Sequence, residues 1–517
     1  MAETPKDSKP SKRTEALWSK NWFYITLVLV AVIGGGCAFI LPYHVQREGD
    51  NIWSLRQAIL AATGGVLAIL TLWENRRKNI QEKEKNDQDH TRQVHAERRA
   101  RYAKAVEQLA DEKAPIRLGG VYTLVKLVDD WLDDEKTLPS EDERRQEGQI
   151  IIDSLCAYIR SSFPLAERHD ELTHSYEEYQ QTYQVKNQSP HSLLKTLQII
   201  PLPKPKNTKT TNTKQSREEF LRDKSIFREE QEVRQTILSE IKKRLNGGEV
   251  KREDGKHEIA PGKWSYFEYD FLSTVFFYDV NLNEVNFSGK KISFSSAEFI
   301  QQADFSRTTF HEVTDFFGAK FTEIATFFGA KFTEHAYFSI AEFTDQAYFF
   351  KATFTEGATF FGAKFTETAT FSEAKFTGTI DFSGAEFTRG AYFPGAEFTR
   401  GATFSEAKFT GIATFSEAKF TGTTDFSGAE FTWDAYFSEA IFENIPKFEY
   451  TLDNKTYKAR FSHKADPEGY NFEVSHDSPY KIKTEEQEYN GVKFTIPKGA
   501  VLFDPDEPSD LEDDDES

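Results

Sequence analysis

Residues 369–382 read ATFSEAKFTGTIDF, and residues 413–426 repeat them almost unchanged as ATFSEAKFTGTTDF. Both lie in a stretch from Phe294 to Phe442 in which phenylalanine recurs at alternating spacings of five and six residues, giving 28 phenylalanines in 14 units of 11 residues. A strict period of this length predicts a solenoid, because each unit can bury its apolar face only against its neighbours. The alternating spacings would scatter the rings around an α-helix, so the period favours short strands separated by corners.

Within each unit the pattern is Ala-x-Phe-[Ser/Thr]-x, and Ala stands two residues before the phenylalanine in 23 of the 28 cases. This pattern resembles the pentapeptide-repeat family, whose unit is a small residue, a polar residue, a central Leu or Phe and two polar residues. The resemblance implies a right-handed quadrilateral β-helix, a β-solenoid whose small and central residues point inward. The chain departs from the family pattern because every second side carries one extra residue. We therefore predict a 22-residue coil with sides of five, six, five and six residues, so that 28 phenylalanines at four per coil make about seven coils.

A row of charged residues supports the 22-residue coil. In coils of that size these side chains would stack about 4.8 Å apart on one outer face, where opposite charges attract. Duplication of the segment explains the near-identical copy, but it explains seven alternating positions less well. The charge alternates in sign without exception along the row Glu298, Lys320, Glu342, Lys364, Glu386, Lys408 and Glu430.

The N-terminal part of the chain has the composition of a membrane anchor. Residues 22–45 and 52–73 are apolar runs, the second interrupted by Arg56, and both are long enough to span a bilayer as helices. Basic residues lie before the first run and after the second, so the positive-inside rule predicts a two-span α-helical hairpin in the inner (plasma) membrane with both termini in the cytoplasm. A single span plus a buried helix is the alternative. A cleaved signal peptide is disfavoured because the first run is too long.

Changes in composition divide the rest of the chain into segments. Residues 101–160 resemble the helical module that precedes the repeats in membrane-anchored pentapeptide-repeat proteins, and their amphipathic pattern is also like that of paired α-solenoid helices. The predicted segments are a disordered basic tail (1–20), two transmembrane helices (21–73), a helical stalk (74–100), a cytoplasmic α-helical module (101–250) with a disordered linker (186–216), the β-helix with its N-terminal cap (257–445), a small β-rich C-terminal cap (446–503) and a disordered acidic tail (504–517).

The composition argues against several classes of function. The 517 residues carry a formal net charge of −19, which disfavours a general nucleic-acid binder. The two cysteines, Cys37 and Cys156, provide no disulfide framework. No catalytic or phosphate-binding motif is present. His90 and His95 are five residues apart in the stalk, which is the wrong spacing for one helical face, so we expect them to be solvated rather than metal ligands. We therefore expect no catalytic, cofactor-binding or metal-binding residues and no enzymatic activity.

These features predict a non-enzymatic scaffold or protein-interaction module, held in the bilayer by residues 22–45 and 52–73, that presents a rigid β-helix to the cytoplasm. Its partner would be an unidentified cytoplasmic or membrane protein and no nucleic acid; its oligomeric state stays open. Arg56 within the second apolar run suggests, as an alternative, a regulator acting through the hairpin. The excess of acidic residues in the rod allows, less well, a DNA-mimic inhibitor of a DNA-binding enzyme. Enzyme activity would have to reside in residues 445–501.

Overall fold

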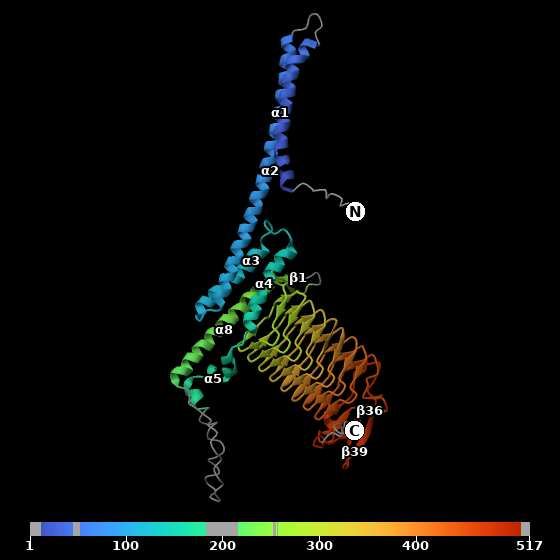
Figure 1. The fold of residues 1–517 in the computed structure, drawn as a ribbon. Helices are drawn as coiled ribbons and strands as arrows, with labels where there is room; N and C mark the ends of the chain where they lie inside the picture. Colours follow the sequence, from blue (N-terminus) through green and yellow to red (C-terminus); the bar gives the residue numbers. More distant parts are fainter. Residues whose placement is uncertain (1–11, 45–51, 182–215, 252–254, 256, 508–517) are drawn as a thin grey trace, which may run out of the picture. The chain divides into compact units, whose positions relative to one another are not determined.

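Long helices and a β-helix make up the computed structural model (Figure 1). The structure describes residues 12–44, 52–181, 216–251, 255 and 257–507. It divides into two units, residues 1–99 and residues 100–517. Apart from Ser216, the linker expected over residues 186–216 lies outside the described residues, and so do the first 11 residues of the expected N-terminal tail and the last 10 of the acidic tail.

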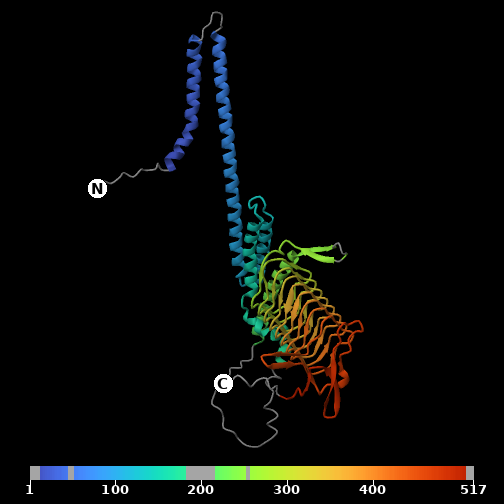
Figure 2. The same ribbon diagram turned by 90° about the vertical axis from the view of Figure 1, so that its right-hand side faces the viewer.

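The first unit consists of two helices that run side by side (Figures 1 and 2). α1 spans Lys12–His44, and α2 spans Ile52–Leu109, the last part of which belongs to the second unit. The ammonium group of Lys78 on α2 donates to the hydroxyl of Tyr24 on α1 at 3.4 Å. By length and composition alone, the segment Trp22–Pro42 and α2 are each long and apolar enough to cross a membrane.

The helix boundaries differ from the sequence-based segments at one point. The sequence predicts a disordered tail over residues 1–20, whereas α1 begins at Lys12. Residues 12–18 read KRTEALW, which contains neither Pro nor Gly and includes several strong helix formers, so the helix extends past the apolar run. For the same reason α2 continues without a break through residues 74–100, where Glu, Lys, Arg and Gln predominate.

A helical module opens the second unit. It comprises the end of α2 together with α3 (Ala114–Leu132), α4 (Glu141–Arg160), η1 (Pro164–Arg168), α5 (His169–Thr173) and α8 (Arg217–Leu245). Each long helix buries a stripe of apolar residues at helical spacing, and these stripes form one continuous core. Two helices begin at capping serines: the Ser140 hydroxyl accepts from the Glu143 amide, and Ser216 forms a capping box with Glu219.

Four parallel sheets form the sides of the β-helix, and the chain visits them in a fixed order that we call the first, second, third and fourth face. The first face comprises β3 (Tyr269–Asp270), β7 (Ile292–Ser293), β11 (Thr314–Asp315), β15 (Ala336–Tyr337), β19 (Gly357–Thr359), β23 (Thr379–Asp381), β27 (Ala402–Thr403) and β31 (Thr424–Asp425). The second face comprises β4 (Val275–Phe276), β8 (Glu298–Phe299), β12 (Lys320–Phe321), β16 (Glu342–Phe343), β20 (Lys364–Phe365), β24 (Glu386–Phe387), β28 (Lys408–Phe409), β32 (Glu430–Phe431), β37 (Arg460–Ser462) and β41 (Val501–Phe503).

The other two faces are built in the same way. The third face comprises β5 (Val280–Asn281), β9 (Ala303–Asp304), β13 (Ala325–Thr326), β17 (Ala347–Tyr348), β21 (Thr368–Thr370), β25 (Gly390–Tyr392), β29 (Ile412–Thr414), β33 (Ala435–Tyr436) and β38 (Tyr470–Asn471). The fourth face comprises β6 (Asn286–Phe287), β10 (Thr309–Phe310), β14 (Lys331–Phe332), β18 (Thr353–Phe354), β22 (Lys375–Phe376), β26 (Glu397–Phe398), β30 (Lys419–Phe420) and β34 (Ile441–Phe442).

Phenylalanine rings fill the inside of the β-helix, stacked from coil to coil. The ring centroid of Phe365 lies 4.8 Å from those of Phe343 and Phe387, with the planes within 3° of parallel. All three side chains are buried, as are the alanines two residues before each. In the sheet of the second face, Phe365 pairs in register with both Phe343 and Phe387, which confirms the predicted coil size.

The β-helix is longer than predicted, about eight turns rather than seven. On the N-terminal side, Phe276 stacks on Phe299 and Phe287 stacks on Phe310, so part of the segment expected to form the N-terminal cap already forms a coil. On the C-terminal side, Phe431 stacks on Phe461 at 4.8 Å after an insertion. The stack therefore extends beyond the stretch in which the spacing is strict.

Three antiparallel hairpins and a short 3₁₀ helix adjoin the ends of the β-helix. β1 (Asn246–Lys251) pairs with β2 (His257–Pro261) before the first coil. β35 (Glu449–Leu452) pairs with β36 (Lys455–Lys458), and β39 (Thr484–Tyr489) pairs with β40 (Val492–Pro497), both after the last regular coil. The 3₁₀ helix η2 spans Pro467–Gly469. Most residues of β1, β35, β36 and β39 are exposed.

Two of the four corners in each coil are tight turns with a residue in the left-handed region. A positive φ recurs once in every unit of the repeat from Ser296 to Glu439. Glycine occupies many of these positions because it adopts this conformation without steric cost, but Glu417 has a φ of 59°. A side chain in this region raises the energy of the folded state by about 1–2 kcal/mol.

We expect Glu417→Gly to raise the free energy of unfolding by about 1 kcal/mol, because it relieves this backbone strain without removing a buried contact. Gly395 stands one coil earlier in the same row with a φ of 65°, so Gly395→Glu should lower it by a similar amount. Urea denaturation of the full chain in detergent, followed by circular dichroism, measures both changes. Equal stabilities for the two variants would contradict a strained corner.

Candidate functional site

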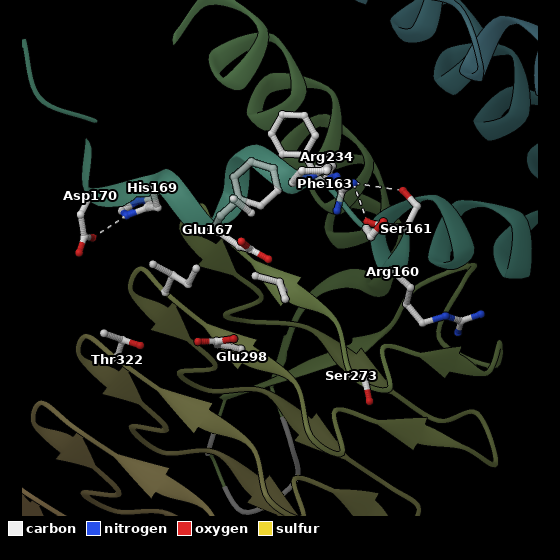
Figure 3. A pocket seen from close by; sticks show the side chains of 16 residues that line it. Arg160, Ser161, Phe163, Glu167, His169, Asp170, Arg234, Ser273, Glu298 and Thr322 are labelled. Carbon is white, nitrogen blue, oxygen red and sulfur yellow. Dashed lines mark hydrogen bonds and ion pairs between the residues drawn. The ribbon is translucent and has the colours of Figure 1, made fainter. Parts of the chain in front are cut away.

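A cavity of about 750 Å³ lies between η1 and α5 of the helical module and the first coils of the second face (Figure 3). Apolar side chains, among them Phe163, Phe277 and Ile300, form part of its wall. We call it the joint cavity. Its labelled lining residues in Figure 3 are Arg160, Ser161, Phe163, Glu167, His169, Asp170, Arg234, Ser273, Glu298 and Thr322.

Several polar groups of the joint cavity are engaged in contacts between the helices and the β-helix. Arg160 Nη1 donates to the carbonyl of Asp270 at 2.5 Å and lies 3.2 Å from its carboxylate. The imidazole of His169 donates from Nδ1 to Asp170 at 3.2 Å and accepts at Nε2 from the amide of Gln301 at 2.9 Å. These contacts attach α4 and α5 to the first coils. The polar groups of the cavity therefore serve to join the helices to the β-helix.

Arg234 lines the cavity and is almost completely buried. Its Nη1 donates to the carbonyl of Ile159 at 2.6 Å, and its Nη2 donates to the carbonyl of Ser161 at 2.9 Å. Nε donates to Glu230 Oε1 at 2.7 Å. The guanidinium also lies 5.3 Å from the ring centroid of Phe277, at cation–π distance. Nε, Nη1 and Nη2 of Arg234 all donate hydrogen bonds to groups of the protein itself. Arg234 therefore holds the end of α4 in place and is not a binding group for an anion.

Glu230 is the centre of a buried polar network that includes Arg234. Besides Arg234, its carboxylate accepts from the hydroxyl of Tyr158 at 2.9 Å and lies 3.5 Å from Arg117 Nη2. The network therefore links α3, α4 and α8 through one side chain. Burial raises the pKa of Tyr158 well above its ordinary value, and the Glu230 charge adds to this effect. Such a network favours one packing of the helices and is costly when broken.

Cys156 lies in α4 with its thiol buried against the first coils. Burial raises the pKa of this thiol to about 12, so almost no thiolate forms at neutral pH. In a Cys37→Ser background, we expect the folded chain to resist maleimide labelling at about pH 8 and to be labelled stoichiometrically once it is denatured. Mass spectrometry measures the label. Labelling of the folded chain at the rate of free cysteine would contradict the buried placement.

The predicted row of alternating charges lies on the outside of the second face. Lys320 pairs in register with Glu298 and with Glu342, whose carboxylate lies 4.0 Å from the Lys320 ammonium. The row continues past its predicted end, because Arg460 pairs with Glu430 at 2.7 Å. Such pairs contribute little stability each, but opposite charges alternate along the whole row and so cancel within it.

The sequence predicts no catalytic, cofactor-binding or metal-binding residue, and this stays a prediction. His90 and His95 both lie on α2. Among the described residues, no group of three or more His, Cys, Asp or Glu side chains is placed to hold a metal ion. The joint cavity was not predicted, because its helical wall (residues 160–170) and its β-helical wall (residues 273–322) are far apart in the sequence and share no motif.

Comparison with known proteins gives one match. A family model described as pentapeptide repeats (9 copies) matches residues 271–320, 360–408 and 404–451. All three ranges lie in the β-helix and its C-terminal extension. No curated protein and no solved structure matches the chain.

Proposed function

The β-helix of this chain belongs to the pentapeptide-repeat family, and on that basis we propose that the chain is a non-enzymatic, membrane-anchored scaffold whose β-helix presents binding faces to a partner protein. The observation that carries the proposal is the filled interior. Phenylalanine and alanine occupy it from coil to coil and are buried, which leaves the outer faces as the surface available for recognition. A long row of short parallel strands gives those faces a fixed spacing, which suits them to a partner that needs a rigid platform.

The two apolar helices of the first unit support the membrane part of the proposal. They have the length and composition of membrane spans. Lys and Arg precede the first span, and Arg76, Arg77 and Lys78 follow the second, so both flanks would face the cytoplasm as a two-span hairpin. The β-helix would then be cytoplasmic, attached to the inner membrane.

Protease accessibility in spheroplasts tests this topology. If the β-helix is cytoplasmic, protease added to intact spheroplasts leaves residues 100–517 undigested, and the same protease digests them after the membrane is permeabilised. Resistance to alkaline extraction tests integral association. Digestion from the outside would overturn the proposed orientation and change the set of partners.

A photo-crosslinking residue placed on each face of the full chain tests the scaffold itself. Suitable outward positions are Phe361 on the first face, Thr388 on the second, Tyr392 on the third and Thr399 on the fourth. We expect an adduct of one discrete mass from one face and none from the others. Absence of an adduct from all four faces in intact cells would overturn the scaffold proposal.

Arg56 is the observation that favours the second candidate, a regulator acting through the hairpin. Its guanidinium lies 5.2 Å from the ring centroid of Phe39 on α1, so it already has a partner within the first unit. Arg56→Leu would separate the two candidates. If the chain is a regulator, the variant should lose its regulatory effect in cells. If the chain is a scaffold, the variant should still give the crosslinked adduct from one face. The row of alternating charges on the second face weighs against the third candidate, a DNA mimic, because the charges within this row cancel.

A further inference from the structure

Exposed apolar side chains are concentrated on three neighbouring coils of the first face and at its two edges. Phe317 and Phe361 stand two coils apart in one row, with Ser339 between them, and they are 44% and 53% exposed. Isolated exposed apolar residues are ordinary, but a contiguous group of them on a rigid face indicates a contact surface. We call this group the aromatic patch: Val313, Phe317, Tyr337, Ile340 and Phe361.

Glutamates border the aromatic patch along one edge. They are Glu312, Glu334 and Glu356, which occupy equivalent positions in successive coils. Each lies two residues before one of three residues that pair in register, namely Thr314, Ala336 and Ala358. All three glutamates are exposed, and none makes an ion pair with a described residue. We call them the acidic edge. Like charges stacked about 4.8 Å apart repel one another, unlike the alternating row on the second face.

The acidic edge ends where the aromatic patch ends. In the same row Lys290 precedes Glu312, and Gly378 and Arg400 follow Glu356, so the negative charge is confined to the three coils that carry the exposed rings. His335 lies between the two groups, with its ring centroid 4.7 Å from that of Tyr337. Burial lowers the pKa of His335, so its ring is neutral at physiological pH and does not offset the glutamates.

The opposite side of the rod shows a similar pattern, in which some of the groups contact cations of the chain itself. On the third face, Phe328 and Phe350 stack at 5.6 Å, and the ammonium of Lys351 lies 4.7 Å from the Phe350 ring. At the neighbouring corner, Glu367 pairs with Arg389 at 3.3 Å. On the third face, therefore, Lys351 contacts an aromatic ring and Arg389 pairs with a carboxylate. Among the described residues, no Lys or Arg forms an ion pair with the acidic edge or lies over a ring of the aromatic patch.

We propose that the aromatic patch and the acidic edge together bind a cationic amphipathic helix of the partner protein. Apolar side chains of the helix would cover the aromatic patch, and Lys or Arg would pair with Glu312, Glu334 and Glu356. The spacing suits such a ligand: a helix lying along the rod presents one side chain per turn of about 5.4 Å, close to the coil spacing of about 4.8 Å. The inference rests on the proposed scaffold function and adds the surface and the chemistry of the partner.

Binding of a synthetic peptide to the full chain in detergent tests the proposal. The probe is a fluorescein-labelled 18-residue peptide of Leu and Lys patterned as an amphipathic helix, measured by fluorescence anisotropy against empty micelles. The edge variant carries Glu312→Gln, Glu334→Gln and Glu356→Gln. Its matched control carries Glu323→Gln, Asp345→Asn and Glu367→Gln, which remove the same formal charge from the opposite corner of the same coils.

We expect the edge variant to raise the Kd at least tenfold and the matched control to raise it less than threefold. The patch variant, Phe317→Ser with Phe361→Ser, should also raise it at least tenfold; it should fold, because serine occupies this row in other coils. If the edge variant and its control raised the Kd equally, the binding would depend only on long-range charge, and the proposed site would be overturned. An unchanged Kd in the patch variant would overturn it as well. Thermal melts check that all variants are folded.

Crosslinking in cells separates this inference from the scaffold proposal. An adduct from Phe361 that is lost in the edge variant supports both. An adduct only from Thr388, Tyr392 or Thr399 would keep the scaffold and overturn the first-face site, whereas no adduct from any of the four positions would reject both.

Discussion

Phe365→Ala is expected to lower the free energy of unfolding by about 3–5 kcal/mol, the usual cost of truncating a buried aromatic ring. The Phe365 ring stacks at 4.8 Å on the ring above and on the ring below, so alanine leaves a cavity between two coils that cannot close without shortening the rod. Urea denaturation of the full chain in detergent, monitored by circular dichroism, measures the loss.

Phe361→Ala provides the control, because Phe361 lies four residues earlier in the same coil and is 53% exposed. Its substitution should change the stability by less than about 0.5 kcal/mol, as expected for surface positions. A comparable loss in both variants would mean that the inner rings do not carry the stability of the β-helix.

Glu230→Gln is expected to lower the free energy of unfolding by about 3–5 kcal/mol, because it leaves the buried guanidinium groups of Arg117 and Arg234 without their counter-charge. Glutamine keeps the size of the side chain, so the loss reports on charge rather than on packing. The helical module should lose stability before the β-helix does, which near-ultraviolet circular dichroism of Trp131 and Trp264 can follow.

Glu342→Gln is the matched comparison on the surface. Glu342 is 44% exposed and faces Lys320 at 4.0 Å, so its removal should cost at most about 1 kcal/mol. If Glu230→Gln proved equally mild, the buried network would not be what joins α3, α4 and α8.

The strictly periodic part of the β-helix could be predicted because its information is local and repeated. A ring at every fifth or sixth residue, with alanine two residues before it, allows one inward arrangement, and the charges around Glu342 then fix two repeat units as one coil. The extension of the β-helix beyond Phe442 could not be predicted from the spacing of the phenylalanines. Phe461 stacks on Phe431 across a longer stretch of chain than one regular coil, because the hairpin of β35 and β36 is inserted between them.

The left-handed corners and the joint cavity depend on the folded structure more than on the local sequence. Glu417 by itself gives no signal for a positive φ; the signal lies in the glycines at equivalent positions of other units, such as Gly395. The joint cavity depends on how α4 and α5 pack against the first coils, which is set by contacts such as Gln301 to His169 between segments 132 residues apart. The first-face surface is intermediate: Phe317 and Phe361 are visible in the sequence, but they form one patch only once the coil size is known.

The alternating charges of the second face also constrain how a gene of this kind can change in length. Loss of one coil, for example the one that holds Glu342, would place Lys320 directly against Lys364. Loss or gain of two coils leaves every lysine between glutamates. Recombination should therefore be tolerated in cassettes of two coils, the offset that separates the near-identical segments 369–382 and 413–426. Descendants of such a gene would carry platforms whose lengths differ in steps of about 10 Å.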